Sequence, residues 1–242
     1  MRTTTLPSMC EVLAKNYNNR NMKARIFEMG KIFIPNADGE KLPDERVIVT
    51  IGMYGECGFY DAKGAAVSLC KALRAEAPTF EALRDNPSYH SGRCAKICIG
   101  GKQAGIVGEL HPLVLENYGI GEVAYVVTLD LALLYENRLP EPLYTPLPKY
   151  PAVTRDIALV CDDELEVARI EEVLKGVCGQ LLEQCKLFDV YRGGNMEKGK
   201  KSVAFSLTLR DKTATMTDET VNKLLTEALD TLERKYGCML RA

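Results

Sequence analysis

One segment near the C-terminal end of the chain combines side chains that can bind nucleic acid. It contains a carboxylate, an aromatic ring and four cations: Asp189, Tyr191, Arg192, Lys198, Lys200 and Lys201. A carboxylate can accept hydrogen bonds from the Watson–Crick edge of guanine, and cations can hold phosphates. The segment is therefore a candidate site for single-stranded RNA. Lys-rich hairpin loops are usually only solvated, and at the level of chemistry this second interpretation stays open.

Residue types used in catalysis do not form a recognisable set. His90 and His111 have no serine or cysteine nucleophile with an orienting acid in an identifiable motif, and His111 precedes a proline, as is typical of a turn. Asp61, Lys63 and Glu109 are expected to cap helices or lie on the surface rather than to exchange protons. We therefore predict no catalytic residue in this chain.

Metal and redox chemistry are not expected either. The chain has nine cysteines, an odd number, and only two histidines, and no two cysteines have CxxC spacing. Six cysteines lie in segments with apolar periodicity: Cys10, Cys70, Cys98, Cys161, Cys178 and Cys185. We interpret these six as reduced core residues and predict neither a metal site nor a cofactor in this chain.

The composition is that of an ordinary globular protein with two domains. The length of 242 residues exceeds the roughly 100 to 150 typical of one domain, and 46% of the residues are hydrophobic. A formal net charge of −2 argues against a generally basic nucleic-acid binder, so RNA would need a local surface and DNA is not expected. The sequence has neither an apolar run of about 20 residues nor a secretory signal, which predicts a cytoplasmic protein without a membrane partner.

A proline-rich segment divides the chain. Five prolines between Asn137 and Pro151 remove backbone donors and favour extended backbone. We predict a first domain at residues 1–136, a linker at 137–150 and a second domain at 151–242. The first domain should be of the α+β class with an antiparallel sheet, because helical and strand patterns are interleaved without βα alternation. Helices are expected at Leu6–Tyr17 and Asp61–Ala75, and strands at Arg25–Ile34, Val47–Tyr54, Ala95–Ile99, Gln103–Leu110 and Val123–Leu131.

The second domain has the element order β-α-β-β-α-β of the ferredoxin-like fold. Its expected strands are Arg155–Cys161, Lys186–Tyr191, Ser202–Arg210 and Cys238–Arg241, and its expected helices are Val167–Val177 and Asp218–Tyr236. Two right-handed crossovers then place both helices on one face of an antiparallel sheet and leave the other face open.

Alternation along the strands predicts which side chains occupy the open face. On the third strand, the residues expected to face the helices are Val203, Phe205, Leu207 and Leu209. The residues expected to face outward are Ser202, Ala204, Ser206 and Thr208. On the second strand Phe188 and Val190 should point inward, which turns Asp189 and Tyr191 outward. The first strand should turn Asp156 and Ala158 outward. The predicted surface is a low platform of small side chains with one aromatic ring and two carboxylates, and with the four cations at its rim.

Several motifs of the second domain are similar to those of a known family. They are Lys149–Val153 leading into Arg155–Val160, then Leu187–Tyr191, Gly199–Phe205 and Thr217–Asn222. In these motifs the domain resembles the anticodon-binding domain of bacterial phenylalanyl-tRNA synthetase β subunits. The resemblance implies contact with the anticodon stem-loop of tRNA(Phe), with Asp189, Ser202 and Ala204 as base-contacting candidates.

The first domain resembles the class II synthetase-like module of the same family. Its markers are Met1–Met9, Arg25–Phe33, Asp61–Gly64, His90–Ala95 and Gly108–Pro112. Catalytic relatives carry, after the strand that matches Arg25–Phe33, an arginine that binds the ATP α-phosphate, whereas Ile34-Pro35-Asn36-Ala37-Asp38-Gly39 follows here. The resemblance implies a non-catalytic component of the ligase. Its partners would be the α subunit, in an α2β2 heterotetramer, and tRNA(Phe), with ATP and magnesium needed only by the whole enzyme.

Two points remain open at this level. The β subunits of this family are longer at the N-terminus, so the resemblance implies a fragment that lacks the editing module. A small-molecule-binding regulatory module is the alternative function, because amino-acid-sensing domains share the β-α-β-β-α-β order. Such domains often bind effectors through glycine-rich turns, which the acidic loop Asp162-Asp163-Glu164 lacks.

Overall fold

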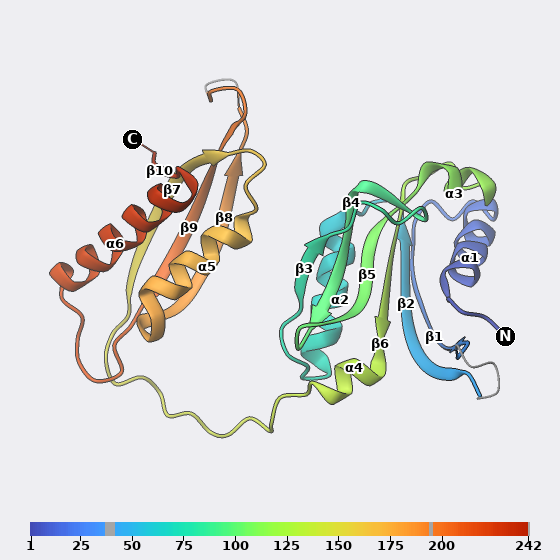
Figure 1. Cartoon of the computed structure of the whole chain (residues 1–242), viewed down its shortest axis with the longest axis horizontal. Coiled ribbons are helices and arrows are strands. Elements are labelled where there is room, and N and C mark those ends of the chain that lie inside the picture. The colour runs from blue at the N-terminus through green and yellow to red at the C-terminus, as the bar shows by residue number, and fades with distance from the viewer. Residues whose placement is uncertain (37–41, 194–195, 242) are drawn as a thin grey trace. The chain divides into compact units, whose positions relative to one another are not determined.

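Long antiparallel strands form the framework of the first of two units (Figure 1). The computed structural model describes residues 1–36, 42–193 and 196–241, and these fall into the units Met1–Pro142 and Leu143–Ala242. The predicted linker, residues 137–150, contains this boundary. Its first part is attached to the first unit, where the Leu139 amide donates to the Arg74 carbonyl over 2.7 Å.

The first unit contains a six-stranded sheet in the order β1-β2-β6-β5-β4-β3. The strands are β1 (Ala24–Ile34), β2 (Asp44–Tyr54), β3 (Thr79–Ala82), β4 (Tyr89–Ile99), β5 (Lys102–Leu110) and β6 (Ala124–Asp130). The predicted hairpin joins β4 to β5. Its turn residues Gly100 and Gly101 have φ of +56° and +73°, values that favour glycine because it has no Cβ.

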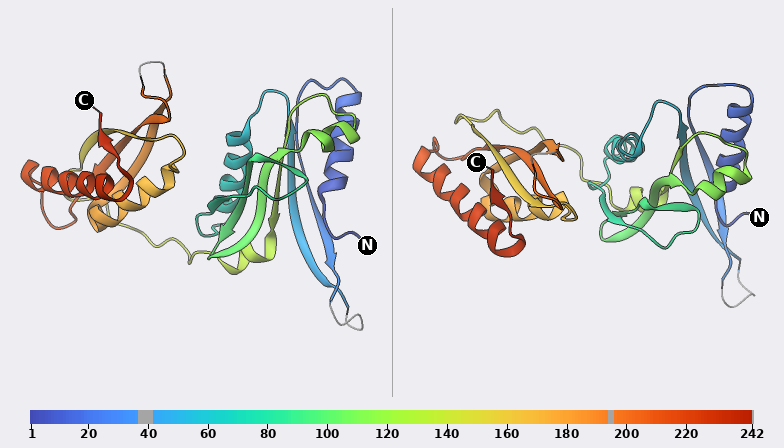
Figure 2. Two further views of the ribbon diagram at one scale, coloured as in Figure 1. Left: turned by 45° about the horizontal axis from the view of Figure 1, so that its top comes forward. Right: turned by 90° about the horizontal axis from the view of Figure 1, so that it is seen from above.

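Helices cover both faces of this sheet (Figure 2). They are α1 (Leu6–Asn18), α2 (Phe59–Ala72), α3 (Pro112–Asn117) and α4 (Leu131–Glu136). One core lies under α1 and α3 and contains Met9 and Leu13, and the other lies under α2 and α4 and contains Ala66 and Leu134. The predicted helices α1 and α2 and the α+β class are confirmed. The short elements β3, α3 and α4 were not predicted from periodicity.

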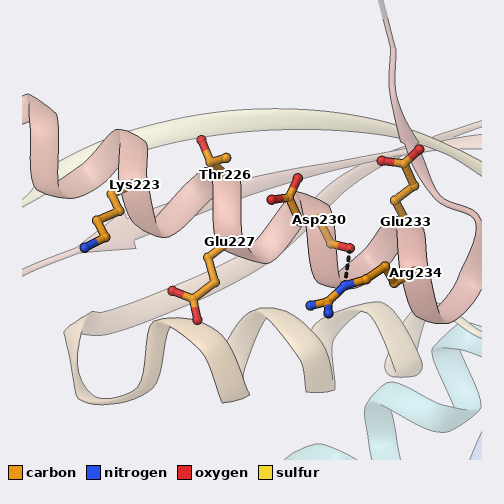
Figure 3. A pocket seen from close by; sticks show the side chains of 6 residues that line it. All are labelled: Lys223, Thr226, Glu227, Asp230, Glu233 and Arg234. Carbon is orange, nitrogen blue, oxygen red and sulfur yellow. Dashed lines mark hydrogen bonds between the residues drawn. The ribbon is translucent and has the colours of Figure 1, made fainter.

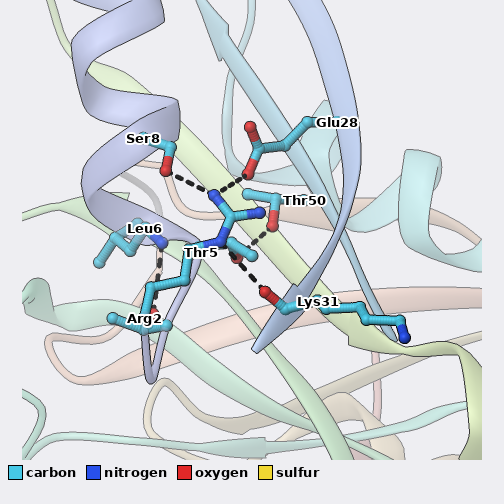
Figure 4. Close-up of polar contacts among 8 residues, drawn as sticks. Arg2, Thr5, Leu6, Ser8, Glu28, Lys31 and Thr50 are labelled. Atoms are coloured by element: carbon cyan, nitrogen blue, oxygen red, sulfur yellow. Dashed lines mark hydrogen bonds and ion pairs between the residues drawn. The ribbon is translucent and has the colours of Figure 1, made fainter. Parts of the chain in front are cut away.

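Arg2 fastens the N-terminal segment to the edge of this sheet (Figure 4). Its guanidinium donates to the Ser8 hydroxyl over 2.6 Å, to the Glu28 carboxylate over 3.2 Å and to the Lys31 carbonyl over 3.2 Å. A Cβ at Gly30 would lie 2.0 Å from this guanidinium, so glycine leaves the space that the arginine occupies. The N-terminal motif is therefore part of the packing of α1 against β1.

The polar residues considered for catalysis have structural roles in the first unit. The His111 ring accepts a hydrogen bond from the Leu113 amide at the start of α3, and Asp61 accepts one from the Gly58 amide at the start of α2. Glu109 was expected at a cap or on the surface, and this is wrong. Its carboxylate is buried and accepts from Arg93, with N–O distances of 2.8 and 3.0 Å. Burial, followed by the charge of Glu109, raises the pKa of Tyr125.

The second unit has the predicted ferredoxin-like fold. Its elements are β7 (Val153–Asp162), α5 (Val167–Cys178), β8 (Leu182–Tyr191), β9 (Lys200–Leu209), α6 (Asp218–Tyr236) and β10 (Met239–Leu240), with a short 3-10 turn at Gly179–Leu181. The four-stranded sheet has the order β10-β7-β9-β8, and all its pairs are antiparallel. Helices α5 and α6 lie together on one face (Figure 1).

The ends of α6 follow from local chemistry. The Thr217 hydroxyl accepts a hydrogen bond from the Thr220 amide at the N-terminus, and Gly237 takes the left-handed conformation at the C-terminus with φ of +62°. Acidic residues in the first turn and basic residues in the last turn also match the helix dipole. These features define the predicted range of α6.

Strand β9 supplies the centre of the second core. Its inward residues Val203, Phe205, Leu207 and Leu209 are all fully buried, as alternation predicts. Phe188 was also expected inward, and this is wrong: its side chain is 54% exposed. The pairing of β8 with β9 shifts between Leu187 and Asp189, so Phe188 is the extra residue of a β-bulge and lies outside the core.

The cysteines behave as core residues. All nine are free thiols, and burial raises the pKa of Cys10, Cys94, Cys185 and Cys238 to about 11. Of the six predicted core positions, Cys185 is only half-buried. Among the helices that the structure describes, none is long and apolar enough to span a membrane.

The opposite burial of two phenylalanines gives a direct test of the sheet register. Phe205→Ala should lower the free energy of unfolding of the second unit by about 3–5 kcal/mol, because it leaves a cavity in the core. Phe188→Ala, the matched control, should change it by less than about 0.5 kcal/mol. Urea denaturation followed by circular dichroism measures both. Equal losses for the two variants would contradict the bulge at Phe188.

Candidate nucleic-acid interface

The sheet face opposite α5 and α6 brings four predicted site residues together. Asp189 and Tyr191 on β8 stand directly opposite Ala204 and Ser202 on β9. Residues directly opposite on one face of an antiparallel pair have Cβ atoms about 4.5–5.5 Å apart. The carboxylate and the ring therefore border the small residues, in the arrangement that alternation predicts.

The bulge in β8 adds a residue that was missed in the sequence. Phe188 and Asp189 are both exposed, and Leu187 and Val190 on either side of them pack into the core. The extra residue at the bulge lets two consecutive side chains lie outside the core, next to Tyr191. Alternation of side chains along the sequence cannot predict this arrangement, because it assumes that the pairing of the two strands is continuous.

The platform itself is covered, which corrects the expectation of an open face. Ser202 is only 3% exposed and Ala204 only 8%. The guanidinium of Arg241 lies over the Tyr191 ring, with 5.4 Å between its carbon and the ring centre. Tyr191 comes from one edge strand and Arg241 follows the other, with β7 and β9 between them. The contact between the two side chains therefore joins opposite edges of the sheet.

Arg241 is held beside the sheet by its backbone. Its amide donates to the Ala158 carbonyl over 2.8 Å, which continues the pairing of β10 with β7. Cys238, just before β10, is buried in the core and anchors the preceding turn. The short terminal strand thus fixes the backbone position of Arg241. From there the long side chain of Arg241 extends to the ring of Tyr191. The sequence predicted a strand at Cys238–Arg241, which includes this arginine. Only the fold shows that Tyr191 is its neighbour.

The basic rim is largely neutralised by two acids at the end of β7 and in the loop after it. Arg192 donates to Asp163 over 2.5 Å and Lys200 donates to Asp162 over 2.6 Å. The hydrogen bond from Arg192 lowers the pKa of Asp163, and the hydrogen bond to Asp162 raises the pKa of Lys200. Exposed pairs of this kind contribute only about 0–1 kcal/mol, so a phosphate could replace the carboxylates. Lys198 is an exposed cation at the same loop.

Lys201 does not belong to the rim, and its predicted place there is wrong. The side chain is 4% exposed, and its ammonium donates to the carbonyls of Asp163 and Leu165 over 2.7 and 2.6 Å. The sequence could have predicted this burial. Side chains alternate along a strand, so Lys201 points to the same side as Val203 and Phe205, toward the helices. Its charge caps the loop between β7 and α5.

The hollow found on the second unit does not enclose a small molecule. A shallow hollow of about 760 Å³ runs along α6 (Figure 3). It is lined by polar and charged side chains of this one helix: Lys223, Thr226, Glu227, Asp230, Glu233 and Arg234. Ligand pockets are usually concave and mostly apolar, so this surface does not support the alternative of a small-molecule regulatory module. Among the described residues no group of His, Cys, Asp and Glu is placed to hold a metal ion.

Comparison with known proteins gives matches over both units. The family model of the phenylalanyl-tRNA synthetase β chain CLM domain matches residues 1–131, and that of the ferredoxin-fold anticodon-binding domain matches residues 148–241. Phenylalanine–tRNA ligase β subunits of Clostridium tetani and Clostridium acetobutylicum are 45% and 44% identical to the chain over 241 residues. The alignments cover 100% of this chain and 30% of each relative.

Similarity in solved structures is lower. A pyrrolysyl-tRNA synthetase of Desulfitobacterium hafniense aligns with a TM-score of 0.47 and 12% identity over 55% of this chain and 48% of its own. The described residues do not include Ala37-Asp38-Gly39, the last part of the segment predicted to replace the ATP-binding arginine. The match of the β-chain model to residues 1–131 extends over more than half of the chain. The chain therefore belongs to the phenylalanyl-tRNA synthetase β-chain family and spans about a third of the length of its curated relatives.

Proposed function

We propose that this chain is a non-catalytic part of a cytoplasmic phenylalanyl-tRNA synthetase and that its second unit binds the anticodon stem-loop of tRNA(Phe). The observation that carries the proposal is the match of residues 148–241 to the ferredoxin-fold anticodon-binding domain. The geometry supports it, because Asp189, Tyr191, Ser202 and Ala204 lie together on the sheet face away from the helices. A flat face of this kind suits an unpaired base better than it suits a small metabolite.

Each side chain of this face has a distinct chemical task. The exposed Asp189 carboxylate accepts hydrogen bonds from the N1–H and N2–H₂ groups of a guanine. Tyr191 offers a ring for stacking, Ser202 offers a hydroxyl, and Ala204 keeps the floor low. Lys198, Arg192 and Lys200 border the face at the loop before β9 and attract the phosphates.

The first unit supplies subunit assembly. Phe27 and Met29 lie on the edge strand β1 and are 77% and 66% exposed, although both are apolar. Exposed apolar pairs on an edge strand favour contact with another protein. We assign this surface to the α subunit, within an α2β2 heterotetramer. Catalysis with ATP and magnesium is then a property of the whole enzyme.

Replacement of the carboxylate tests base recognition. Asp189→Ala should weaken binding of an anticodon stem-loop by about 1–3 kcal/mol and reduce discrimination for guanine, because the acceptor for its edge is lost. Fluorescence anisotropy with a labelled stem-loop measures the affinity. Asp230→Ala removes an exposed carboxylate on α6, on the other side of the sheet, and should bind like wild type. If both variants retain wild-type affinity, the base contact lies elsewhere.

The two neighbouring lysines should behave differently. Lys201→Met leaves the carbonyls of Asp163 and Leu165 without their ammonium donor and should lower the free energy of unfolding by about 1–3 kcal/mol. Lys200→Met should leave stability within about 1 kcal/mol, because its ion pair with Asp162 is exposed. It should instead weaken stem-loop binding and flatten the salt dependence by about 0.7 per lost phosphate contact. Thermal unfolding and anisotropy at two salt concentrations separate the effects, and a stability loss in Lys200→Met alone would refute this division.

The assembly surface is tested by charge insertion. Phe27→Asp and Met29→Asp should reduce co-elution with the α subunit in size-exclusion chromatography, because a carboxylate cannot be buried cheaply at an apolar contact. Phe188→Asp, an exposed aromatic residue of the second unit, is the matched control and should co-elute like wild type. If wild type itself fails to associate at micromolar concentration, this surface alone does not assemble the enzyme.

A further inference from the structure

Two cysteines of the second unit lie close together in its core. Cys161 is the penultimate residue of β7, and Cys238 comes directly before β10. Their side chains are 0% and 2% exposed, and both belong to the core beneath α5 and α6. Both are free thiols. Whether they can react with each other depends on their relative position in the sheet.

The register of β10 on β7 places these two residues directly opposite each other. Met239 pairs with Val160, so one step back along β10 places Cys238 opposite Cys161. Burial, followed by the neighbouring Cys161 thiol, raises the pKa of Cys238 to about 11, so the two sulfur atoms lie close enough to act on each other's ionisation. Other strand cysteines face different residue types: Cys94 faces Gly108, Cys98 faces Gln103 and Thr79, and Cys185 faces Leu207.

The type of pairing also suits a disulfide. Hydrogen-bonded and non-hydrogen-bonded pairs alternate along an antiparallel ladder. The Arg241 amide donates to the Ala158 carbonyl over 2.8 Å, so this pair is hydrogen-bonded and the Cys238–Cys161 pair, three residues along, is not. Non-hydrogen-bonded pairs have Cα atoms about 4.5 Å apart, within the roughly 4.4–6.8 Å that a disulfide spans. At this spacing the two sulfur atoms can bond without a shift of either strand.

We propose that Cys161 and Cys238 are a modification site, at which hydrogen peroxide forms a disulfide that locks β10 onto β7. The Cys238 thiolate attacks one peroxide oxygen and breaks the O–O bond, which gives a sulfenic acid and, after protonation, a water molecule. The Cys161 sulfur then attacks the sulfenic sulfur, loses its proton and releases the oxygen as a second water. The two thiols together lose two electrons, and the peroxide takes up both.

The short terminal strand gives the oxidant access. Strand β10 has two residues, Met239 and Leu240, which are 56% and 57% exposed. Short terminal segments open more readily than central strands. Opening exposes the Cys238 thiol, whereas Cys161 stays on β7, which remains paired with β9. Burial raises the pKa of both thiols and keeps them protonated in the closed unit, so reducing conditions leave the pair open and only excess oxidant joins it.

Treatment of the full chain with hydrogen peroxide tests the pair. The number of thiols that iodoacetamide labels after unfolding should fall by two, and non-reducing peptide mapping should find Cys161 joined to Cys238. The thermal midpoint of the second unit should rise by about 10 °C, because the disulfide closes a long loop from β7 through α6 and limits the unfolded chain. Hydrogen exchange of the Arg241 amide should slow by about tenfold. Dithiothreitol should reverse each change.

Variants separate this pair from the other thiols. Cys161→Ala and Cys238→Ala should each lose the rise in midpoint, measured between the oxidised and reduced forms of the same variant, so that the cost of the substitution itself cancels. Cys178→Ala removes another buried thiol of the second unit and should keep the rise.

Peptide mapping of the wild-type chain decides the proposal even where a variant fails to fold. A disulfide from Cys161 or Cys238 to a different cysteine, a disulfide between two chains, or full labelling of both thiols after treatment with excess peroxide would overturn the site. A mapped Cys161–Cys238 bond without slower exchange at Arg241 would overturn the lock on β10. The reaction needs no RNA, so either result leaves the proposed function unchanged.

Discussion

The register of β9 between β7 and β8 is the constraint on which the second unit depends. Side chains alternate along a strand, so one register sends Val203, Phe205 and Leu207 to the helices and turns the small residues between them to the other face. A slip by one residue would bury serine and threonine under α5 and α6 and expose the core. The same hydrophobic pattern that stabilises the fold therefore fixes which residues occupy the opposite face, where we propose that RNA binds.

The cations around this face have different kinds of partner. The cations at the loop before β9 face the acids that follow β7, and these exposed pairs hold the loop while adding little to stability. Lys201 is different because its ammonium donates hydrogen bonds to two carbonyls of the loop, those of Asp163 and Leu165. Arg241 is the cation whose partner is an aromatic ring rather than an oxygen. Four lysines and arginines near this face thus have three different physical roles.

Helix bounds and element order could be predicted from the sequence, because hydrophobic periodicity and capping residues determine them. The range of α6 follows from Thr217 and Gly237, and the ferredoxin-like order follows from the succession of patterns. Phe188 could not be placed, because a bulge changes the pairing without changing the hydrophobic pattern. The contact between Tyr191 and Arg241 joins opposite edges of the sheet, which only the strand order reveals. Lys201 alternates in step with the buried Val203 and Phe205, so its burial could have been predicted. Its charge led instead to the prediction that it lies on the surface.

The two units expose surfaces of different chemistry, and each suits a large partner. On β1 the apolar Phe27 and Met29 stand between the ion pairs Arg25–Asp61 and Lys31–Glu45, so an apolar centre is framed by charge, as in protein interfaces. On the second unit the aromatic rings stand beside carboxylates and cations, a composition that favours bases and phosphates. In the described residues, neither surface encloses a cavity. The first surface therefore suits the proposed α subunit and the second suits the proposed RNA, because each presents an extended pattern of groups to a large partner.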